Sequence, residues 1–403
     1  MSKGKSQAIS QLQSKRFFIE LLRALPRWGL VGERRNALVL YIVATSRLLS
    51  RPLNVFVKGA SSSGKNHLAR TVLRSIPDSQ VREISSSSAN AWSYGDDDFA
   101  HRVIYLQEKN EDTGNVHPLR LLISEGRIMR QVTVRAGAGF KTEKYETKGP
   151  VACISTTTEH SLAIDDETRH VSIWIDESEK QTRRIIKAEA EGQSERSQED
   201  IGLWRNVQRV IAARAATPIE MPRWFSSDSF LRHVRADDIR VRRYFPAFTQ
   251  ACKTVCLIRS FSRDPAADEG QLVVDFIDFA ITATIFDRVF ADSIRRPNDE
   301  HVATRQFVKA MVAENGGAVQ AADYAVAARI SLDDAYARLR DAARSGAVRR
   351  VNKPGKNNLK LFLPSECARF IPSPQKIFSE LTGMPNRVEY IDPLTGELVV
   401  LSR

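Results

Sequence analysis

Hydrophobic residues near the start of the chain recur at the spacing of a helix. Between residues 17 and 25 they lie three and four positions apart, which predicts a helix that Pro26 ends. The same kind of pattern runs from about residue 33 to 49 and predicts a second helix. The first fifty residues are therefore expected to be helical.

Shorter apolar runs, rich in β-branched residues, follow and predict strands. A strand is expected over residues 54–57, then a loop of glycine and serine, then a helix over about 65–75. Three further runs, HRVIYLQE, GPVACISTTT and HVSIWID, end in polar residues and alternate with helical patterns. Such alternation indicates a parallel sheet covered by helices, so the expected fold class is α/β.

The second half of the chain is predicted to be mostly helical and to include a small separate domain. Between residues 299 and 364, three helical patterns precede two strand patterns around a Pro-Gly turn, with leucines alternating at 359, 361 and 363. This order is typical of a winged helix-turn-helix, whose third helix is expected to begin at Ser331 with Asp334 as capping partner. The predicted limits are 1–50 for a helical segment packing on the core, 51–186 for the core with a hairpin over 130–147, 187–298 for a helical lid, 299–365 for the winged helix and 366–403 for a tail.

The composition favours binding to anionic partners, and the absence of long apolar segments indicates where in the cell the protein is expected. The 403 residues include 60 Lys and Arg against 48 Asp and Glu, a net charge of +12, which favours a polyanion and salt-sensitive binding. The four cysteines form no CxxC pair, so buried free thiols are expected. The N-terminus has no apolar export segment, and no apolar run approaches the ~20 residues of a membrane span. We therefore expect a cytoplasmic protein with no membrane partner.

The loop after the first predicted strand, GASSSGK, has the spacing of a phosphate-binding loop. Glycines allow close approach of the backbone, the following helix directs its N-terminus at phosphate, and Lys65 suits the β and γ oxygens. A strand before the loop and a helix after it favour phosphate binding over a small-residue connector that binds nothing. The candidate residues for ATP are Gly59, Ala60, Ser61, Ser62, Ser63, Gly64, Lys65, Asn66 and His67.

Amides stand where this kind of site usually holds Mg²⁺. Asn66 occupies the usual Ser or Thr position of the loop, and Gln107 occupies the usual aspartate position at the end of the strand in VIYLQEKNE. Both are candidates for Mg²⁺, directly or through its water shell. Glu108 follows the same strand and is placed to polarise the attacking water, although a solvated charge at a strand end is the alternative.

Five stretches in a fixed order resemble the minichromosome-maintenance helicases, which are AAA+ ATPases, and the helicase-like ATPases of bacterial mobile elements. The stretches are LQEKNEDTGNVHPLRLLISEGRIMRQVTVRAGA, VACISTTT, ETRHVSIWIDES, IRVRRYFPAFTQACKTVCLIR and the phosphate loop. The resemblance covers about residues 15–300 and implies a ring, a hexamer in that family, with ATP between neighbouring copies.

The resemblance also implies roles for single residues. It matches Lys65 to the Walker lysine and Glu108 to the catalytic glutamate. Thr157 falls near the first sensor, although any residue from Ser155 to Thr158 suits it. The remaining matches are Arg169 as arginine finger and Arg242 as second sensor, with Arg243 as close competitor.

Two basic features are candidates for DNA contact. The hairpin in RIMRQVTVRAGAGFKTEKYETKG projects into a central channel in the resembled helicases, where Arg135 matches the residue that holds the nucleic-acid backbone, with Lys141 and Lys144 nearby. The predicted wing carries Arg349, Arg350, Lys353 and Lys356. Solubilising charge is the alternative for the hairpin, and protein contact is the alternative for the winged helix.

The leading hypothesis is an ATP-dependent DNA helicase or translocase, a replicative helicase of a mobile element or phage that acts as an oligomeric ring. The second is an ATP-gated DNA-binding initiator, loader or regulator, in which the amides at Asn66 and Gln107 indicate slow turnover. A small-molecule kinase is a third reading, but it leaves the winged helix unexplained.

Overall fold

The computed structural model describes residues 3–84, 98–107, 116–136, 139–159, 162, 164–192, 200–236, 238–263, 270–294, 299–344, 347–352, 360–364 and 370–403. The chain divides into two compact units. Unit 1 comprises Met1–Val289 and Ile371–Arg403, and unit 2 comprises Phe290–Phe370. None of the helices in these described ranges is long and apolar enough to cross a membrane.

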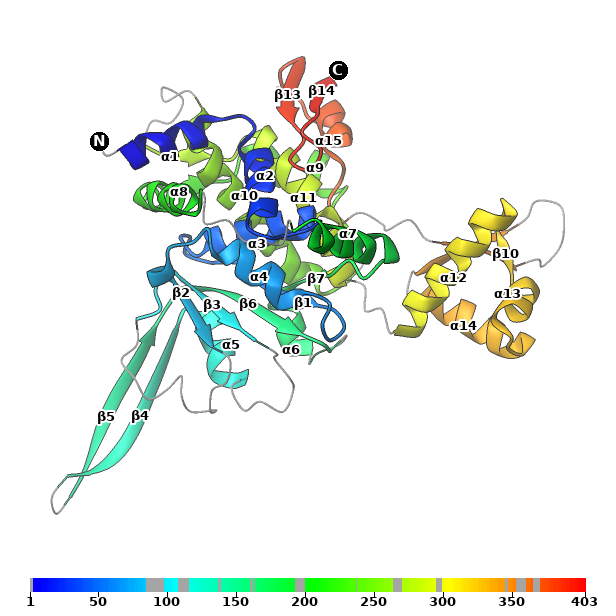
Figure 1. Cartoon of the computed structure of the whole chain (residues 1–403), viewed down its shortest axis with the longest axis horizontal. Coiled ribbons are helices and arrows are strands. Elements are labelled where there is room, and N and C mark those ends of the chain that lie inside the picture. The colour runs from blue at the N-terminus through cyan, green and yellow to red at the C-terminus, as the bar shows by residue number, and fades with distance from the viewer. Residues whose placement is uncertain are drawn as a thin grey trace. The chain divides into compact units, whose positions relative to one another are not determined.

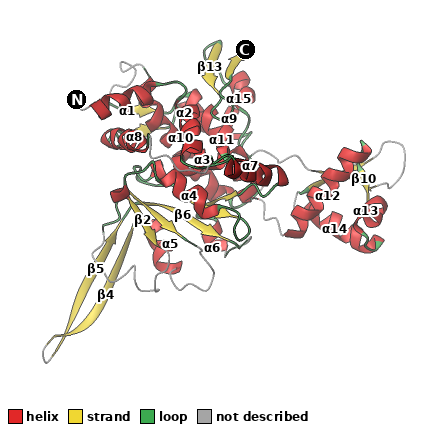
Figure 2. Cartoon of the chain, viewed as in Figure 1, coloured by secondary structure: helices red, strands yellow, loops and turns green. Residues whose placement is uncertain are grey.

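The core of unit 1 is a five-stranded parallel sheet in the order β2-β3-β6-β1-β7, which confirms the α/β class (Figures 1 and 2). All residues of β1 and β6 are buried, as expected for central strands of a parallel sheet covered by helices. Since the strands are parallel, their carboxyl ends meet at one edge. The strands are β1 (Asn54–Lys58), β2 (Val81–Ile84), β3 (Arg102–Leu106), β6 (Val151–Thr157) and β7 (Val171–Trp174).

The N-terminal helices are part of the core of unit 1. Helix α3 (Arg34–Ser46) is buried from Ala37 to Ser46 and contacts α4, α10, β1 and β6, because its apolar residues lie on all sides. Helix α2 (Phe17–Arg27) extends past Pro26, which the helix accommodates in its last turn instead of ending before it. The preceding α1 spans Lys3–Gln13, and α4 after the phosphate loop spans Lys65–Leu73.

The expected hairpin is present and is longer than the predicted 130–147. Strand β4 (Arg127–Ala136) pairs with β5 (Gly139–Lys148) along its whole length, from Arg127 opposite Lys148 to Ala136 opposite Gly139. Figure 1 shows the pair as a two-stranded ribbon that projects from the sheet, next to α5 (Val116–Glu125).

Among the described residues up to Val289, six further α-helices begin in unit 1, and three of them, α9, α10 and α11, contribute rings to an aromatic cluster. The six helices are α6 (Ile164–Glu167), α7 (Glu179–Ala190), α8 (Ile201–Ala213), α9 (Asp228–Leu231), α10 (Val241–Arg259) and α11 (Phe276–Ile294). Short strands β8 (Ile219–Glu220) and β9 (Leu272–Val273) pair in parallel. The rings of Trp224, Phe225, Phe230, Phe248 and Phe279 contact one another, with centroids 4.6 to 6.4 Å apart.

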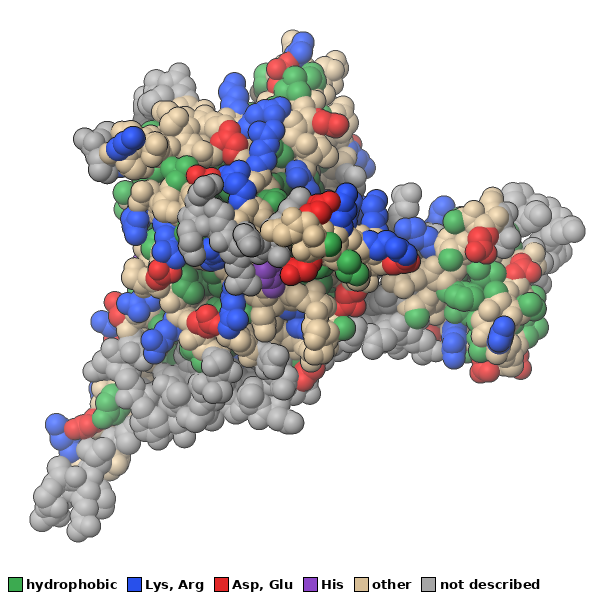
Figure 3. All heavy atoms as spheres, viewed as in Figure 1, with side chains coloured by type: hydrophobic (Ala, Val, Ile, Leu, Met, Phe, Trp, Pro, Cys, Tyr) green, Lys and Arg blue, Asp and Glu red, His purple; other side chains and the backbone are tan. Residues whose placement is uncertain are grey.

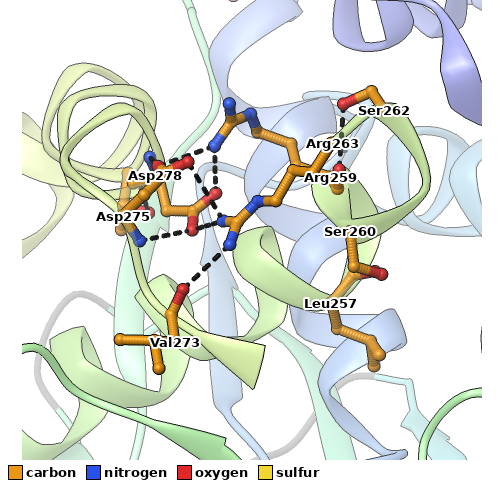
Figure 4. Close-up of polar contacts among 9 residues, drawn as sticks. Leu257, Arg259, Ser260, Ser262, Arg263, Val273, Asp275 and Asp278 are labelled. Atoms are coloured by element: carbon orange, nitrogen blue, oxygen red, sulfur yellow. Dashed lines mark hydrogen bonds and ion pairs between the residues drawn. The ribbon is translucent and has the colours of Figure 1, made fainter. Parts of the chain in front are cut away.

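An ion-pair network joins the end of α10 to the start of α11 (Figure 4). Asp278 is fully buried and its two carboxylate oxygens contact Arg259 and Arg263. Asp275 also binds Arg259, with 2.9 Å between Oδ1 and Nη1, and its backbone N–H donates to Asp278 Oδ2 at 2.9 Å. Two acids thus compensate two guanidinium groups at this helix junction.

The last 33 residues return to unit 1 and form α15 (Pro374–Glu380) and the hairpin of β13 (Arg387–Ile391) and β14 (Leu398–Ser402). Arg34 Nε donates to the Leu394 carbonyl at 3.0 Å, and the rings of Phe276 and Phe378 lie 5.3 Å apart. This segment, in which the sequence revealed no pattern, is therefore packed on both the N-terminal helices and α11.

Unit 2 contains the helices and strands expected between residues 299 and 364. Its core includes Val308, Tyr324, Leu339 and Phe362. In β12 the buried residue is Phe362, while Leu361 and Leu363 are half-buried, so the alternating leucines do not mark the core side. The elements are α12 (Asp299–Asn315), β10 (Val319–Gln320), α13 (Ala321–Ala328), α14 (Leu332–Arg344), β11 (Val348–Asn352) and β12 (Lys360–Pro364), with the strands in the order β10-β12-β11.

The predicted cap of α14 is confirmed. The Asp334 backbone N–H donates to Ser331 Oγ at 3.1 Å, and the Ser331 hydroxyl donates to Asp334 Oδ2 at 2.7 Å. These two hydrogen bonds give a partner to the Asp334 backbone N–H, which has no acceptor within the first turn of α14, and so fix where the helix begins.

Candidate functional site

The glycine-serine loop joins the carboxyl end of β1 to α4, as expected. Gly64 has a φ of 94° and directly precedes Lys65, the first residue of α4, so the loop enters the helix through a left-handed residue. A Cβ on Gly59 would lie 2.7 Å from Ser63 Oγ. Both glycines are therefore required by the local conformation, which directs the N-terminus of α4 into the loop.

The side chain of Lys65 folds back over this loop. It is 6 % exposed, and its Nζ donates to the carbonyls of Gly59 at 2.9 Å and Ala60 at 2.6 Å. An ammonium group is thereby held beside the N-terminus of α4, where both would attract a phosphate group.

Asn66 connects the loop helix to two strand ends. Its Oδ1 accepts hydrogen bonds from Tyr105 at 3.0 Å and from Thr156 at 2.8 Å. Thr157, the residue proposed for the first sensor, instead accepts from the Glu159 backbone N–H at 3.0 Å. Because successive side chains of a strand point to opposite faces, Thr156 is the residue of β6 that faces the loop.

Gln107 lies at the carboxyl end of β3 and contacts Glu83 of β2 through its side-chain amide. Glu83 also pairs with Arg70 of α4, with 2.8 Å between Oε1 and Nη2. Gln107 and Asn66 therefore stand at the same edge of the sheet, but each is bound to a different partner. Glu108, the proposed catalytic carboxylate, lies outside the described residues.

The neutral oxygens around Asn66 fit a hydrated Mg²⁺ better than a directly coordinated one. Asn66 Oδ1 already accepts two hydrogen bonds, so a direct bond to the ion would replace at least one of them. Mg²⁺ keeps several of its waters in protein sites, and such waters can be held by amide and hydroxyl groups. The group at Asn66, Tyr105 and Thr156 can therefore hold the ion's water shell.

His67 faces away from the loop. Its Nε2 lies 2.8 Å from the Gly29 carbonyl, in the turn between α2 and α3. Gln181 of α7 also holds this turn, because its Nε2 donates to the Val31 carbonyl at 2.7 Å. Gly32, with a φ of 71°, leaves room for that glutamine. The turn over residues 29–33 thus borders the loop helix, which sequence patterns did not show.

Glu177 is a second residue of the site that the sequence did not reveal. It follows β7, and its Oε1 accepts the backbone N–H of Ala60 at 2.5 Å. The only sequence signal is an acidic residue after an apolar strand, which is common in proteins of many kinds. The Glu177 carboxylate nevertheless places a negative charge directly beside the phosphate loop.

Arginines gather at the opposite end of the sheet. Arg169 lies two residues before the start of β7, and its Nε donates to Ser124 Oγ at 2.9 Å. Burial, and after it the nearby guanidinium of Arg243, lowers the pKa of Arg169, and Arg120 acts in the same direction. Both Arg242 and Arg243 are exposed, and Arg243 reaches the Thr168 hydroxyl at 3.1 Å. The structure thus brings Arg243, rather than Arg242, beside Arg169.

The proposed DNA-contacting residues that the structure describes are exposed. Lys141 and Lys144 lie on β5, and Arg349 and Arg350 lie on β11. Lys141 is near Glu143, with 3.8 Å between the charged atoms, and Figure 3 shows acidic side chains interspersed among the basic ones. Lys353, Lys356 and the side chain of Arg135 lie outside the described residues.

Residues 26–213 match the family model described as "MTBMA_p00010 P-loop domain". The matched range runs from the end of α2 through the loop and the whole parallel sheet to α8. No curated protein sequence matches the chain. The match, the sheet order and the loop together support a P-loop NTPase, which is compatible with nucleotide and Mg²⁺ binding.

Proposed function

We propose that the protein is an ATP-dependent DNA helicase or translocase, a replicative helicase of a mobile element or phage, that acts as a ring of identical copies. The observation that carries this proposal is the position of the arginines relative to the phosphate loop. Val55 of β1 pairs with Val171 of β7, so Arg169 is level with Leu53. Gly59 lies six residues further on, about 20 Å at the rise of a strand.

That separation exceeds the length of an arginine side chain, so Arg169 cannot act on nucleotide bound to its own loop. Asp165 and Asp166 pair with Arg169 and Arg120 at 3.7 and 2.6 Å and offset part of this positive charge. The triphosphate of a neighbouring copy is an anion that the remaining charge would attract. ATP would thus lie between copies, with Lys65 on one side and Arg169, with Arg243, on the other. This arrangement makes hydrolysis depend on assembly.

Within this proposal each residue has a defined task. Lys65 and the loop amides bind the phosphates, Glu108 orients the attacking water, and Arg169 stabilises charge that develops on the γ-phosphate. Mg²⁺ bound to the phosphates offsets their negative charge. The residues that would hold its water shell are Asn66, Tyr105 and Thr156, with Gln107 at the same edge of the sheet.

The β4–β5 hairpin and unit 2 are the proposed DNA-contacting parts. The exposed Lys141 and Lys144 suit contact with phosphates, which is independent of base sequence and compatible with movement along a strand. Unit 2 would act as a winged helix whose basic β11 adds DNA affinity. The acidic residues Asp333 and Asp334 at the start of α14 disfavour reading of bases there.

The test is steady-state ATP hydrolysis by the full chain, with and without single-stranded DNA. Wild type should be stimulated by DNA, and Lys65→Ala and Glu108→Gln should each lose hydrolysis. Arg169→Ala should also lose it while still binding nucleotide, whereas Arg183→Ala, an exposed arginine on α7, serves as matched control. Undiminished hydrolysis by Lys65→Ala would refute the proposal.

Mixing two inactive variants tests the shared site directly. A mixed ring of Lys65→Ala and Arg169→Ala contains junctions in which an intact Lys65 faces an intact Arg169. Activity should therefore reappear on mixing and vary with the ratio of the two variants. If the mixture stays as inactive as its components, Arg169 does not act between copies.

The alternative is an ATP-gated DNA-binding protein with slow hydrolysis, which the two hydrogen bonds to Asn66 Oδ1 favour. Deleting residues 299–403 would not distinguish the two, because residues 371–403 belong to unit 1. The double substitution Arg349→Ala and Arg350→Ala distinguishes the motor from the ATP-gated switch. A motor should keep DNA-stimulated hydrolysis, and a switch should lose its DNA affinity.

A further inference from the structure

The carboxylate of Glu177 lies at the entrance of the phosphate loop. Its Oε1 accepts the Ala60 N–H at 2.5 Å, and a Cβ built on Gly59 would be only 2.9 Å from the same oxygen. The side chain of Lys65, from the start of α4, also reaches this loop and donates to the carbonyls of Gly59 and Ala60. The carboxylate of Glu177 therefore binds a part of the loop backbone that is suited to binding an anion.

The backbone on each side of Glu177 is held in place. The Asp176 N–H donates to Glu33 Oε1 at 2.8 Å, before the glutamate. After it, Ser178 caps α7 by accepting the Gln181 N–H at 3.2 Å, and Gln181 is bound to the α2–α3 turn. The position of the carboxylate is thus set by its own side-chain torsions on a fixed backbone, and the side chain can leave without unfolding its neighbours.

Phosphate and the Glu177 carboxylate would compete for the same hydrogen-bond donors and positive charge at the loop. The N-terminus of α4 and the ammonium of Lys65 favour an anion at the loop. Glu177 is an anion at the start of the same loop, where it accepts the Ala60 N–H. A bound nucleotide brings several negative charges to the loop, and a carboxylate within a few ångströms would be repelled. The two anions cannot use the Ala60 N–H at the same time.

We propose that Glu177 is a built-in competitor of the nucleotide phosphates, which binds the Ala60 N–H of the loop and is displaced when a nucleotide binds. This inference rests on the proposed nucleotide binding and adds a residue that sets its strength. Glu177 lowers nucleotide affinity, because binding must first break its bond to Ala60. It also speeds release of the product, because it re-enters the loop as the nucleotide leaves.

The substitution Glu177→Gln removes the charge and keeps the shape. A neutral amide is a weaker acceptor for the Ala60 N–H and is not repelled by phosphate. We expect ADP to bind about tenfold more tightly, which corresponds to about 1.4 kcal/mol, and to dissociate correspondingly more slowly. The matched control is Glu179→Gln, which removes the same charge two residues further on, from an exposed side chain that pairs with Arg183 at 2.6 Å.

The experiment is a titration of the full-length wild type and both variants with a fluorescent ADP analogue in Mg²⁺, followed by displacement with unlabelled ADP to obtain the dissociation rate. Tighter binding and slower release in Glu177→Gln alone support the competitor. Affinity equal to wild type, or weaker binding, overturns it while wild-type binding leaves the proposed nucleotide site intact. If neither wild type nor Glu177→Gln binds the analogue, the proposed nucleotide function fails and this inference fails with it.

Discussion

The buried carboxylate of Asp278 should carry much of the stability of the α10–α11 junction. It is fully buried between Arg259 and Arg263, whose side chains are 15 % and 12 % exposed. In Asp278→Asn an amide nitrogen would face one of these guanidinium groups, which would lose its acceptor. Breaking a buried pair costs about 3–5 kcal/mol, and the small residual exposure together with Asp275 reduces this to about 2–3 kcal/mol of unfolding free energy.

Urea unfolding followed by tryptophan fluorescence measures this effect in unit 1, because all five tryptophans lie outside residues 290–370. Asp275→Asn is the control in the same network. Its side chain is 38 % exposed, so solvent screens the charge and we expect a loss below about 1 kcal/mol. Equal losses for the two variants, or a loss below about 0.5 kcal/mol for Asp278→Asn, would show that burial does not set the strength of this network.

Three further results are expected. Gly32→Ala should lower the unfolding free energy by about 1–3 kcal/mol, since its Cβ would collide with the Gln181 side chain, and adding Gln181→Ala should restore part of the loss in urea titrations. Hydrogen bonds from Arg232 and, to a smaller extent, from His233 lower the pKa of Glu380 below its ordinary 4.5. The stabilising effect of the ionised carboxylate is therefore present above pH 4.5 and is lost as the pH falls through the lowered pKa. The difference in unfolding free energy between wild type and Glu380→Gln should shrink as the pH falls from 4.5 through the lowered pKa. Lys144→Ala should reduce the slope of log affinity for DNA against log salt by about 1, and an unchanged slope would remove this lysine from the DNA contacts.

Local patterns were sufficient where neighbours in sequence decide the structure. The apolar run of β1 with the glycines after it predicted strand, loop and helix, because a buried strand and a left-handed turn both leave a mark within a few residues. The Ser331–Asp334 cap could be predicted for the same reason, since its partners are three residues apart. Pro26 shows the limit of such rules, because the last turn of α2 tolerates it once the helix is packed.

The contacts that complete the candidate site join residues far apart in the chain. Glu177 and Ala60 are 117 positions apart, and Arg243 and Thr168 are 75 apart. Strand order and register bring each pair together, and neither leaves a periodic trace around the residues concerned. The choice of Thr156 over Thr157 depended on one step of strand alternation, which a sequence without a known register cannot resolve.

The sequence by itself therefore determined the α/β class, the phosphate loop and its lysine, because hydrophobic spacing and glycine positions are local properties of the chain. Only the tertiary structure decided that a carboxylate contacts the loop and that Arg243 joins Arg169 away from it. It also decided that the C-terminal segment packs on α3 through Arg34 and Leu394, 360 positions apart. These contacts follow from the order of strands in the sheet and from the packing of buried helices, in which burial of apolar surface, rather than distance along the chain, determines which residues meet.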